Sequence, residues 1–327
     1  MLWLTGCTIT TGTAHTRRYT PTDRILVLTG GPRVSDGDMV TTARTIRIDR
    51  ATDDAIAEGD VKSTYNELKE QPDGALLASA SPIHVTAATM TAHNSPAVAL
   101  YQGNARLWQD ANLIEAPAIE FDRDRRSLVA QGTRTQPVLT TLVQRKSENR
   151  PRIAPPVGAK AEQSPTPRSG KRQSTPNSPE KVDESSPIAI SAARLSYSDP
   201  ERRAHYDGGV TAHGTGFTAT STEMDVYLLP RSQAPSSQSL TAPGRLDRMV
   251  AQGKVVIDQP GRRAEGNTLV YTAADDKFVL TGGPPSIFDA ERGKITGVSL
   301  TFFRRDDRVL VEGEANTPVV TQTRVAR

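Results

Sequence analysis

The sequence has 327 residues, among which 24 glycines and 23 prolines outnumber 6 phenylalanines, 7 tyrosines and 2 tryptophans. This composition argues against a helical bundle and favours many short strands joined by turns. The single cysteine, Cys7, excludes an internal disulfide framework and a cysteine-based zinc site. A net charge of +3 does not indicate a nucleic-acid partner. No run approaches about 18 consecutive apolar residues, so no membrane-spanning helix is expected.

The first seven residues fit two alternative patterns. Residues 4–7, Leu-Thr-Gly-Cys, look like a lipoprotein cleavage box, but no basic segment and no apolar run of signal-peptide length precede them. The same Leu-Thr-Gly sequence also ends apolar runs later in the chain. We therefore interpret the N-terminus as the middle of a repeat and expect the true start, with any export signal, to lie upstream. Whether Cys7 carries a lipid stays open.

Composition divides the rest of the chain into three segments. Residues 1–143 and 188–327 alternate apolar and polar side chains, as strands do. Residues 144–187 contain 8 of the 23 prolines together with many Ser, Lys and Arg, and almost no large apolar side chain. Such a segment cannot bury enough surface to offset its ordering entropy, so a disordered linker or long loop is expected there. A shorter insert at 230–244 has the same character.

The two alternating segments are built from repeats. Leu-Thr-Gly-Gly-Pro at 28–32 recurs at 280–284, and Val-Ala-Gln-Gly at 129–132 recurs at 250–253. Glycines near the ends of apolar runs are separated by 29 residues in three pairs: Gly30 and Gly59, Gly103 and Gly132, and Gly253 and Gly282. A near-constant step of this kind indicates a repeat array.

One repeat can be interpreted strand by strand. After Gly253, residues 254–258 are expected to form a strand, 259–262 a turn and 264–271 a second strand. A polar turn at 275–277 and a third strand at 278–280 follow. Turns every 8 to 12 residues are typical of an antiparallel all-β protein.

Residues that could carry chemistry are scattered. The close histidine pairs, His84 with His93 and His205 with His213, do not have the short spacing of zinc ligands. Neighbouring aspartates such as Asp275 and Asp276 lie next to basic residues between strands, where they favour turns. We find no nucleophile elbow, phosphate loop or dinucleotide fingerprint. We therefore expect that the protein is not an enzyme and that it binds neither a metal ion nor a cofactor.

The apolar faces of the strands remain as the candidate site. Two-residue periodicity places side chains at 269 and 271, 278 and 280, 300 and 302, and 309 and 311 on one side of their strands. These faces could form a sealed sandwich core. They could also line a trough for an apolar ligand, and composition does not choose between the two.

Three parts of the last repeat carry a family resemblance. Residues 251–258, 263–271 and 278–282 resemble, in order and in their turn glycines, the OstA-type repeat of the LptA family, which includes LptA, LptC and the N-terminal domain of LptD. The resemblance is best over 245–315, recognisable over 188–327 and fainter over 8–65 and 84–143.

The resemblance implies a periplasmic lipopolysaccharide transport protein that is not an enzyme. It implies a β-jellyroll of two twisted antiparallel sheets, in one unit or two in tandem, whose apolar interior holds lipid A acyl chains. Its expected partners are other Lpt-type jellyrolls and further copies of itself, joined by strand addition. The residues expected to contact lipid are Val255, Ile257, Leu269, Tyr271, Phe278, Leu280, Leu300, Phe302, Val309 and Val311.

Two other functions fit the sequence pattern. A β-helical carbohydrate-binding or adhesive repeat protein would need coils stacked in parallel, which the proline-containing turns disfavour. A ligand-free structural module would polymerise through its sheet edges.

Overall fold

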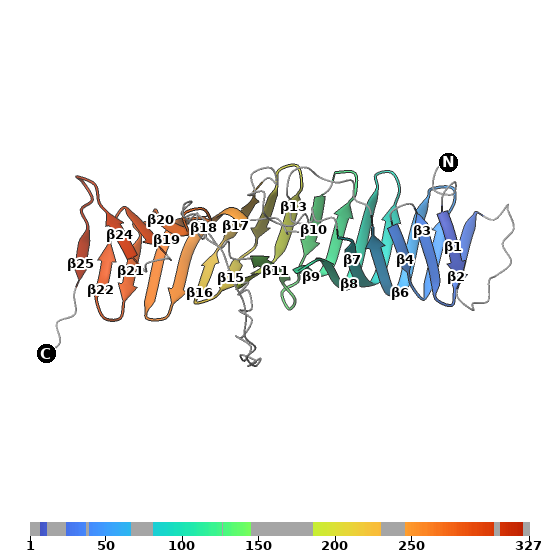
Figure 1. Ribbon diagram of the computed structural model, residues 1–327, viewed down its shortest axis with the longest axis horizontal. Helices are drawn as coiled ribbons and strands as arrows, with labels where there is room; N and C mark the ends of the chain where they lie inside the picture. Colours follow the sequence, from blue (N-terminus) through green and yellow to red (C-terminus); the bar gives the residue numbers. More distant parts are fainter. Residues whose placement is uncertain are drawn as a thin grey trace, which may run out of the picture.

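The computed structural model describes residues 7–11, 24–36, 39–66, 81–125, 127–144, 186–229, 246–303 and 308–322. These residues form 25 strands, and every pairing between named strands is antiparallel. In Figure 1 the strands lie across the long axis of the molecule and follow one another from one chain end to the other. The described part of the chain contains no helix, and so none that could cross a membrane. The all-β antiparallel prediction is confirmed.

The strands form two layers that share six long strands. Hydrogen bonds connect all 25 strands into one network because each long strand lies in the first layer at one end and in the second layer at the other. The six are β6 (Asp54–Tyr65), β7 (Ile83–His93), β8 (Val98–Gln109), β9 (Asn112–Asp122), β18 (Leu246–Gln259) and β19 (Arg262–Thr272).

The shorter strands belong to one layer each. In the first layer they are β1 (Cys7–Thr11), β3 (Pro32–Asp36), β4 (Met39–Thr42), β11 (Val138–Gln144), β12 (Ser186–Ala192), β15 (Val210–Gly214), β16 (Phe217–Ser221), β21 (Ser286–Asp289), β22 (Gly293–Thr296) and β25 (Val320–Gln322). In the second layer they are β2 (Ile25–Thr29), β5 (Thr45–Asp49), β10 (Ser127–Gln131), β13 (Arg194–Ser198), β14 (Arg203–Asp207), β17 (Glu223–Leu228), β20 (Lys277–Thr281), β23 (Ser299–Phe303) and β24 (Arg308–Glu312).

The chain passes between the layers along one side of the molecule, which we call the corner margin. In β18 the register shifts between Gln252 and Val255, and Gly253 and Lys254 there have φ angles of 77° and 49°. Two successive left-handed residues turn the strand from one layer into the other, and glycine adopts this conformation without strain. The predicted strand at 254–258 is therefore the second half of a longer strand, whereas the predicted strands at 264–271 and 278–280 lie within β19 and β20.

The opposite side of the molecule is the open margin. There each strand turns back within its own layer, as at 109–112 in the first layer and 122–127 in the second. Among the described residues, no backbone hydrogen bond joins the two layers along this margin. The layers are thus connected covalently at the corner margin and by side-chain contacts elsewhere.

The layers continue across the middle of the chain. β10 pairs with β13 in the second layer, and β11 pairs with β12 over seven residues in the first. The described strands therefore form one continuous jellyroll on both sides of the predicted linker. The division at 144–187 stays a prediction, because residues 145–185 of that linker and the insert at 230–244 lie outside the described residues. Residues 4–6 also lie outside them, and Cys7 is the first residue of β1.

Candidate functional site

The interior between the layers is lined by rows of apolar side chains that cross strand after strand in register. Two rows lie on the inner face of the second layer. The deep row, farther from the open margin, consists of Leu28, Ile46, Ala57, Met90, Tyr101, Ile119, Ala130, Leu195, Tyr206, Met224, Ala251, Leu269, Leu280, Leu300 and Val311. The margin row consists of Leu26, Ile48, Ala55, Ala92, Ala99, Phe121, Leu128, Tyr197, Ala204, Val226, Met249, Tyr271, Phe278, Phe302 and Val309.

The structure places all ten residues of the predicted apolar site on these inner faces. Eight are buried, and Val309 and Val311 are half-buried against the same core cluster. Val255 and Ile257 face inward from the first layer, and the others belong to the two rows of the second layer. The two-residue periodicity thus identified the inward side correctly. Contact with lipid stays a prediction.

Aromatic side chains from the two layers meet in the C-terminal half of the interior. The ring of Phe217, from the first layer, meets that of Phe278, from the second, edge to face at 5.7 Å. Tyr271 packs on Phe278 with the ring centroids 4.7 Å apart. Around these three rings the interior is packed as the sealed-core interpretation expects. An acyl chain would enter it only if the layers separated at the open margin.

The interior also holds hydroxyl groups that the sequence did not reveal. In the N-terminal half the Tyr65 and Tyr101 hydroxyls are 2.8 Å apart, and those of Thr41 and Ser63 are 2.9 Å apart. Burial raises the pKa of Tyr65 well above its usual value and raises that of Tyr101 to about 12. Where the two halves of the chain meet, the buried Tyr206 hydroxyl on β14 faces Thr140 on β11, but among the described residues neither oxygen has a well-formed hydrogen bond.

This contrast predicts different outcomes for the same substitution. Tyr101→Phe leaves the buried Tyr65 hydroxyl without its partner and is expected to cost about 1–3 kcal/mol of the free energy of unfolding. Tyr206→Phe removes a hydroxyl without a well-formed bond, so a change within about 0.5 kcal/mol, or a gain, is expected. Urea denaturation of the two variants measures the difference. Equal losses would contradict the assignment of the two environments.

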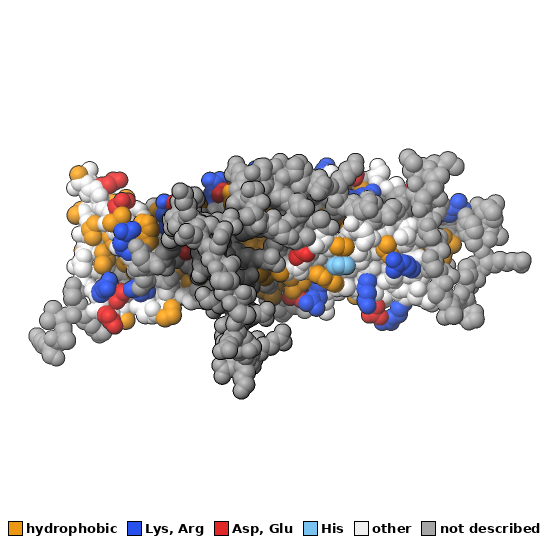
Figure 2. Space-filling model, viewed as in Figure 1, with side chains coloured by type: hydrophobic (Ala, Val, Ile, Leu, Met, Phe, Trp, Pro, Cys, Tyr) orange, Lys and Arg blue, Asp and Glu red, His pale blue; other side chains and the backbone are white. Residues whose placement is uncertain are grey.

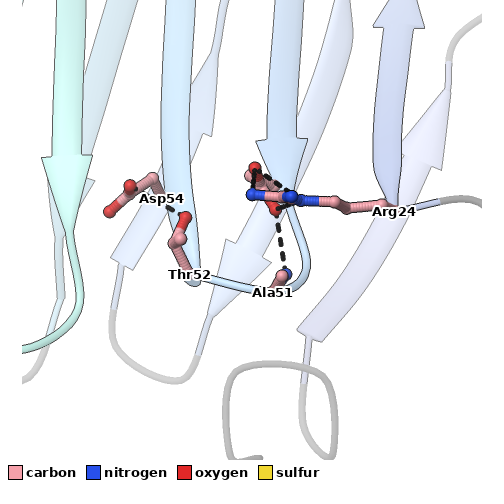
Figure 3. Close-up of polar contacts among 5 residues, drawn as sticks. Arg24, Ala51, Thr52 and Asp54 are labelled. Atoms are coloured by element: carbon pink, nitrogen blue, oxygen red, sulfur yellow. Dashed lines mark hydrogen bonds and ion pairs between the residues drawn. The ribbon is translucent and has the colours of Figure 1, made fainter.

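Ion pairs and turn hydrogen bonds follow the open margin. Figure 3 shows Arg24 directed at the carboxylate at the end of β5, where its Nε and Nη2 donate to Asp49 at 3.0–3.2 Å. The backbone N–H of Ala51 donates to the same carboxylate at 2.9 Å, and the Thr52 hydroxyl donates to Asp54 at 2.8 Å. Arg24 lowers the pKa of Asp49 first through this hydrogen bond, and Ala51 lowers it further. On the face in Figure 2, charged side chains of both signs are interspersed with uncharged ones.

A similar turn in the C-terminal half predicts a dependence of stability on pH. Asp289 accepts hydrogen bonds from the backbone N–H groups of Glu291 and Arg292 and from Arg262 Nε. The bond from Glu291 is the largest cause of the lowered pKa of Asp289. A carboxyl group with a lowered folded-state pKa contributes stability above its unfolded pKa of about 3.9, and this contribution is lost as pH falls through the folded value.

We therefore expect Asp289→Asn to flatten the acid limb of the stability curve. The urea midpoint of the parent protein should fall more steeply than that of the variant as pH decreases from 5 to 2.5. Glu291→Gln, which neutralises an exposed carboxylate of the same turn, is the matched control and should keep the parent slope. Identical slopes for the parent and Asp289→Asn would contradict the prediction.

The four histidines that the structure describes contact neighbours on adjacent strands and not one another. His93 Nδ1 lies 2.6 Å from Asp54 Oδ1, and His205 Nδ1 lies 2.8 Å from Asp225 Oδ1. His84 stacks on Trp108 with the ring centroids 5.3 Å apart. Within the described ranges, no group of three or more His, Cys, Asp or Glu side chains is arranged to hold a metal ion.

The fold and its inner rows define a β-jellyroll with an apolar interior. Residues 189–308 match the family described as LptA/(LptD N-terminal domain) LPS transport protein, so the resemblance seen in the sequence is confirmed for this part of the chain. The members of this family are transport proteins or domains of transport proteins. No curated protein matches the chain.

Among solved structures, one similar chain is LptH of Pseudomonas aeruginosa, described as the LptA homologous periplasmic component of the lipopolysaccharide transport device. The two sequences are 16% identical, and the match covers 40% of this chain and 86% of LptH with a TM-score of 0.33. Because this similarity is weak, the fold described above rests on the strand pairing alone.

Proposed function

We propose that this protein binds lipopolysaccharide and carries it through the periplasm to the outer membrane, with the acyl chains between the two layers. The observation that carries the proposal is the continuity of the apolar inner rows from β2 to β24, in a chain whose residues 189–308 match an LPS transport family. Long parallel rows of buried apolar side chains suit hydrocarbon chains, whereas charged sugars would remain at the open margin.

The energetics are compatible with this role. Sheltering one methylene from water is worth about 0.8 kcal/mol, so an acyl chain of about twelve methylenes gains on the order of 10 kcal/mol before losses. Immobilisation of the lipid reduces this gain. The layers would open at the margin that has no interlayer backbone bonds among the described residues. An entering chain would then replace side-chain contacts such as that between Phe217 and Phe278.

The proposal includes no chemical step. Binding and release of a lipid make and break no covalent bond, so catalytic residues, metal ions and cofactors are not required. The periplasmic location is part of the proposal and is supported by the family of residues 189–308.

The ends of the layers are proposed as the partner surfaces. At the C-terminal end, β24 and β25 are the last strands of the second and first layers. Leu310 is 47% exposed and Val320 50% exposed on these two strands. An unpaired strand edge with exposed apolar side chains can accept a strand from another Lpt-type jellyroll or a second copy of this chain.

Photo-crosslinking tests the lipid-binding proposal. A photoreactive amino acid is placed at Phe278 or Leu300, which face inward, and at Val279 or Thr301, which lie on the opposite faces of the same strands. Labelled lipopolysaccharide should crosslink to the inward positions and not to the outward controls. No crosslinking at the inward positions in a folded protein would overturn the proposal.

The structure disfavours one of the two alternative functions and leaves the other to experiment. The strand pairings are antiparallel, and a β-helix requires parallel coils, so the carbohydrate-binding β-helix is not supported. A ligand-free assembly module stays distinguishable by experiment. Light scattering with and without lipopolysaccharide would show assembly that does not depend on lipid.

A further inference from the structure

The N-terminal half contains a cavity between the layers, at the open margin. Its enclosed space is only about 20 Å³, room for a water molecule, and the volume rises to about 300 Å³ only when the open solvent at its mouth is counted. β4 and β6 line it from the first layer, and β7, β8 and β9 line it from the second. Its apolar lining consists of Met39, Tyr65, Ala92, Ala97, Val98, Ala99 and Phe121.

The size of the side chains in the margin row explains why space remains here. On β6, β7 and β8 this row presents three successive alanines, Ala55, Ala92 and Ala99. On β19 and β20 the same row presents Tyr271 and Phe278, whose rings fill the interior. Next to these methyl groups the Tyr65 and Phe121 rings meet edge to face at 5.3 Å, so the small side chains leave a recess at the margin and not a channel.

A cationic side chain lies at the mouth of this cavity. Arg123 follows β9 directly, is half-buried, and is fixed at its backbone by a 2.9 Å hydrogen bond from its N–H to the Ala97 carbonyl. Its positive charge acts on the Tyr65 phenol, which forms part of the cavity wall.

The neighbouring charged groups are already engaged. Asp122 accepts a hydrogen bond from the backbone N–H of Arg125 at 2.8 Å and lies 3.7 Å from its guanidinium. The backbone N–H of Ala97 donates to Asp124, and His93 pairs with Asp54. None of the ion pairs found within the described residues involves Arg123. The guanidinium is therefore available to an anion at the mouth of an apolar cavity.

We propose that the layers separate at this cavity to admit one hydrocarbon chain of a phosphorylated lipid, with the phosphate bound by Arg123. This inference rests on the proposed function and places the first binding position of the lipid in the N-terminal half, outside residues 189–308. A guanidinium binds phosphate through two parallel hydrogen bonds, and an apolar wall favours the chain by about fourfold in affinity per sheltered methylene. The ligand must therefore combine both features in one molecule.

Isothermal titration calorimetry of the full chain tests the charge requirement. The probes are dodecyl phosphate and dodecyl maltoside, which share a chain length and differ in charge, each below its critical micelle concentration. Dodecyl phosphate should bind at least tenfold more tightly than dodecyl maltoside. Arg123→Gln should remove most of this preference, whereas the exposed neighbour Arg125→Gln should retain it. Equal effects of the two arginine variants would overturn the proposal.

A second variant tests the cavity itself. Ala99→Leu fills the space from the second layer and should weaken binding of both probes at least tenfold. Parent affinity for both probes in an Ala99→Leu protein with a normal melting temperature would overturn the proposal. The proposed function would stand in that case if lipopolysaccharide still crosslinked at Phe278 or Leu300. If it crosslinked at neither position, the proposed function would fail independently of these titrations.

Discussion

Replacing Gly103 with alanine is expected to destabilise the protein by about 2–5 kcal/mol, through backbone strain of about 1–2 kcal/mol and overpacking of about 1–3 kcal/mol. Gly103 has a φ of 82° and lies where β8 passes between the layers at the corner margin. A Cβ at this position would lie 2.6 Å from the Cβ of Ala88 on β7. Both the conformation and the close approach therefore require glycine.

Two further variants separate these contributions. Gly261 has a φ of 75° with nothing within 4 Å of an added Cβ, so Gly261→Ala should show the backbone cost alone, about 1–2 kcal/mol. Ala88→Gly in the Gly103→Ala protein removes the clash between the two methyl groups. It should therefore restore the stability lost through overpacking. Urea denaturation of the four proteins in the Gly103 and Ala88 cycle gives the interaction energy. An interaction energy near zero would contradict the close contact between residues 103 and 88.

Local sequence patterns predicted the strands and the direction of their side chains. Alternation at 269–271 and 278–280 placed Leu269, Tyr271, Phe278 and Leu280 on one face, and all four are buried. This succeeded because a strand buried on one face must repeat its apolar residues every second position. Glycine spacing marked Gly253 as the end of an apolar run, whereas β18 continues through it from one layer into the other.

Contacts between distant strands were not predictable in this way. The hydrogen bond between Tyr65 and Tyr101 joins residues 36 positions apart, on different layers. The cavity depends on Ala92 and Ala99 becoming neighbours of Tyr65. Alanine has a low strand propensity and does not by itself indicate which side of a strand faces the interior. That a particular alanine leaves space between the layers can be recognised only when the register and the packing of the layers are known. The one-jellyroll architecture likewise depends on the pairing of β11 with β12 across the predicted linker.

The continuity of the interior has a consequence for transport. The deep row runs from Ile119 through Ala130 to Leu195 and Tyr206 where the chain passes from its N-terminal to its C-terminal half. All four side chains are buried. An apolar path from the cavity at Ala99 to the proposed site at Phe278 would therefore not leave the space between the layers.

The largest core effect is expected for Leu280→Ala, with a loss of about 2–5 kcal/mol in the free energy of unfolding. Leu280 is fully buried in the deep row, and its Cγ lies 2.7 Å from the position that a Cβ on Gly266 of the first layer would take. The leucine thus packs across the interior against the opposite backbone. Truncating it leaves a void that neither layer can close without moving.

The void left by Leu280→Ala lies where a methyl group on residue 266 would project. Gly266→Ala should destabilise the parent protein because its methyl group meets Leu280, yet it should partly restore stability in the Leu280→Ala protein by entering the void. Leu310→Ala, at a leucine that is 47% exposed, is the matched control and should cost less than about 1 kcal/mol. Denaturant midpoints of the five proteins decide the outcome. If Gly266→Ala lowers stability equally with and without Leu280, the two layers do not meet at this point, and the interior described here is wrong.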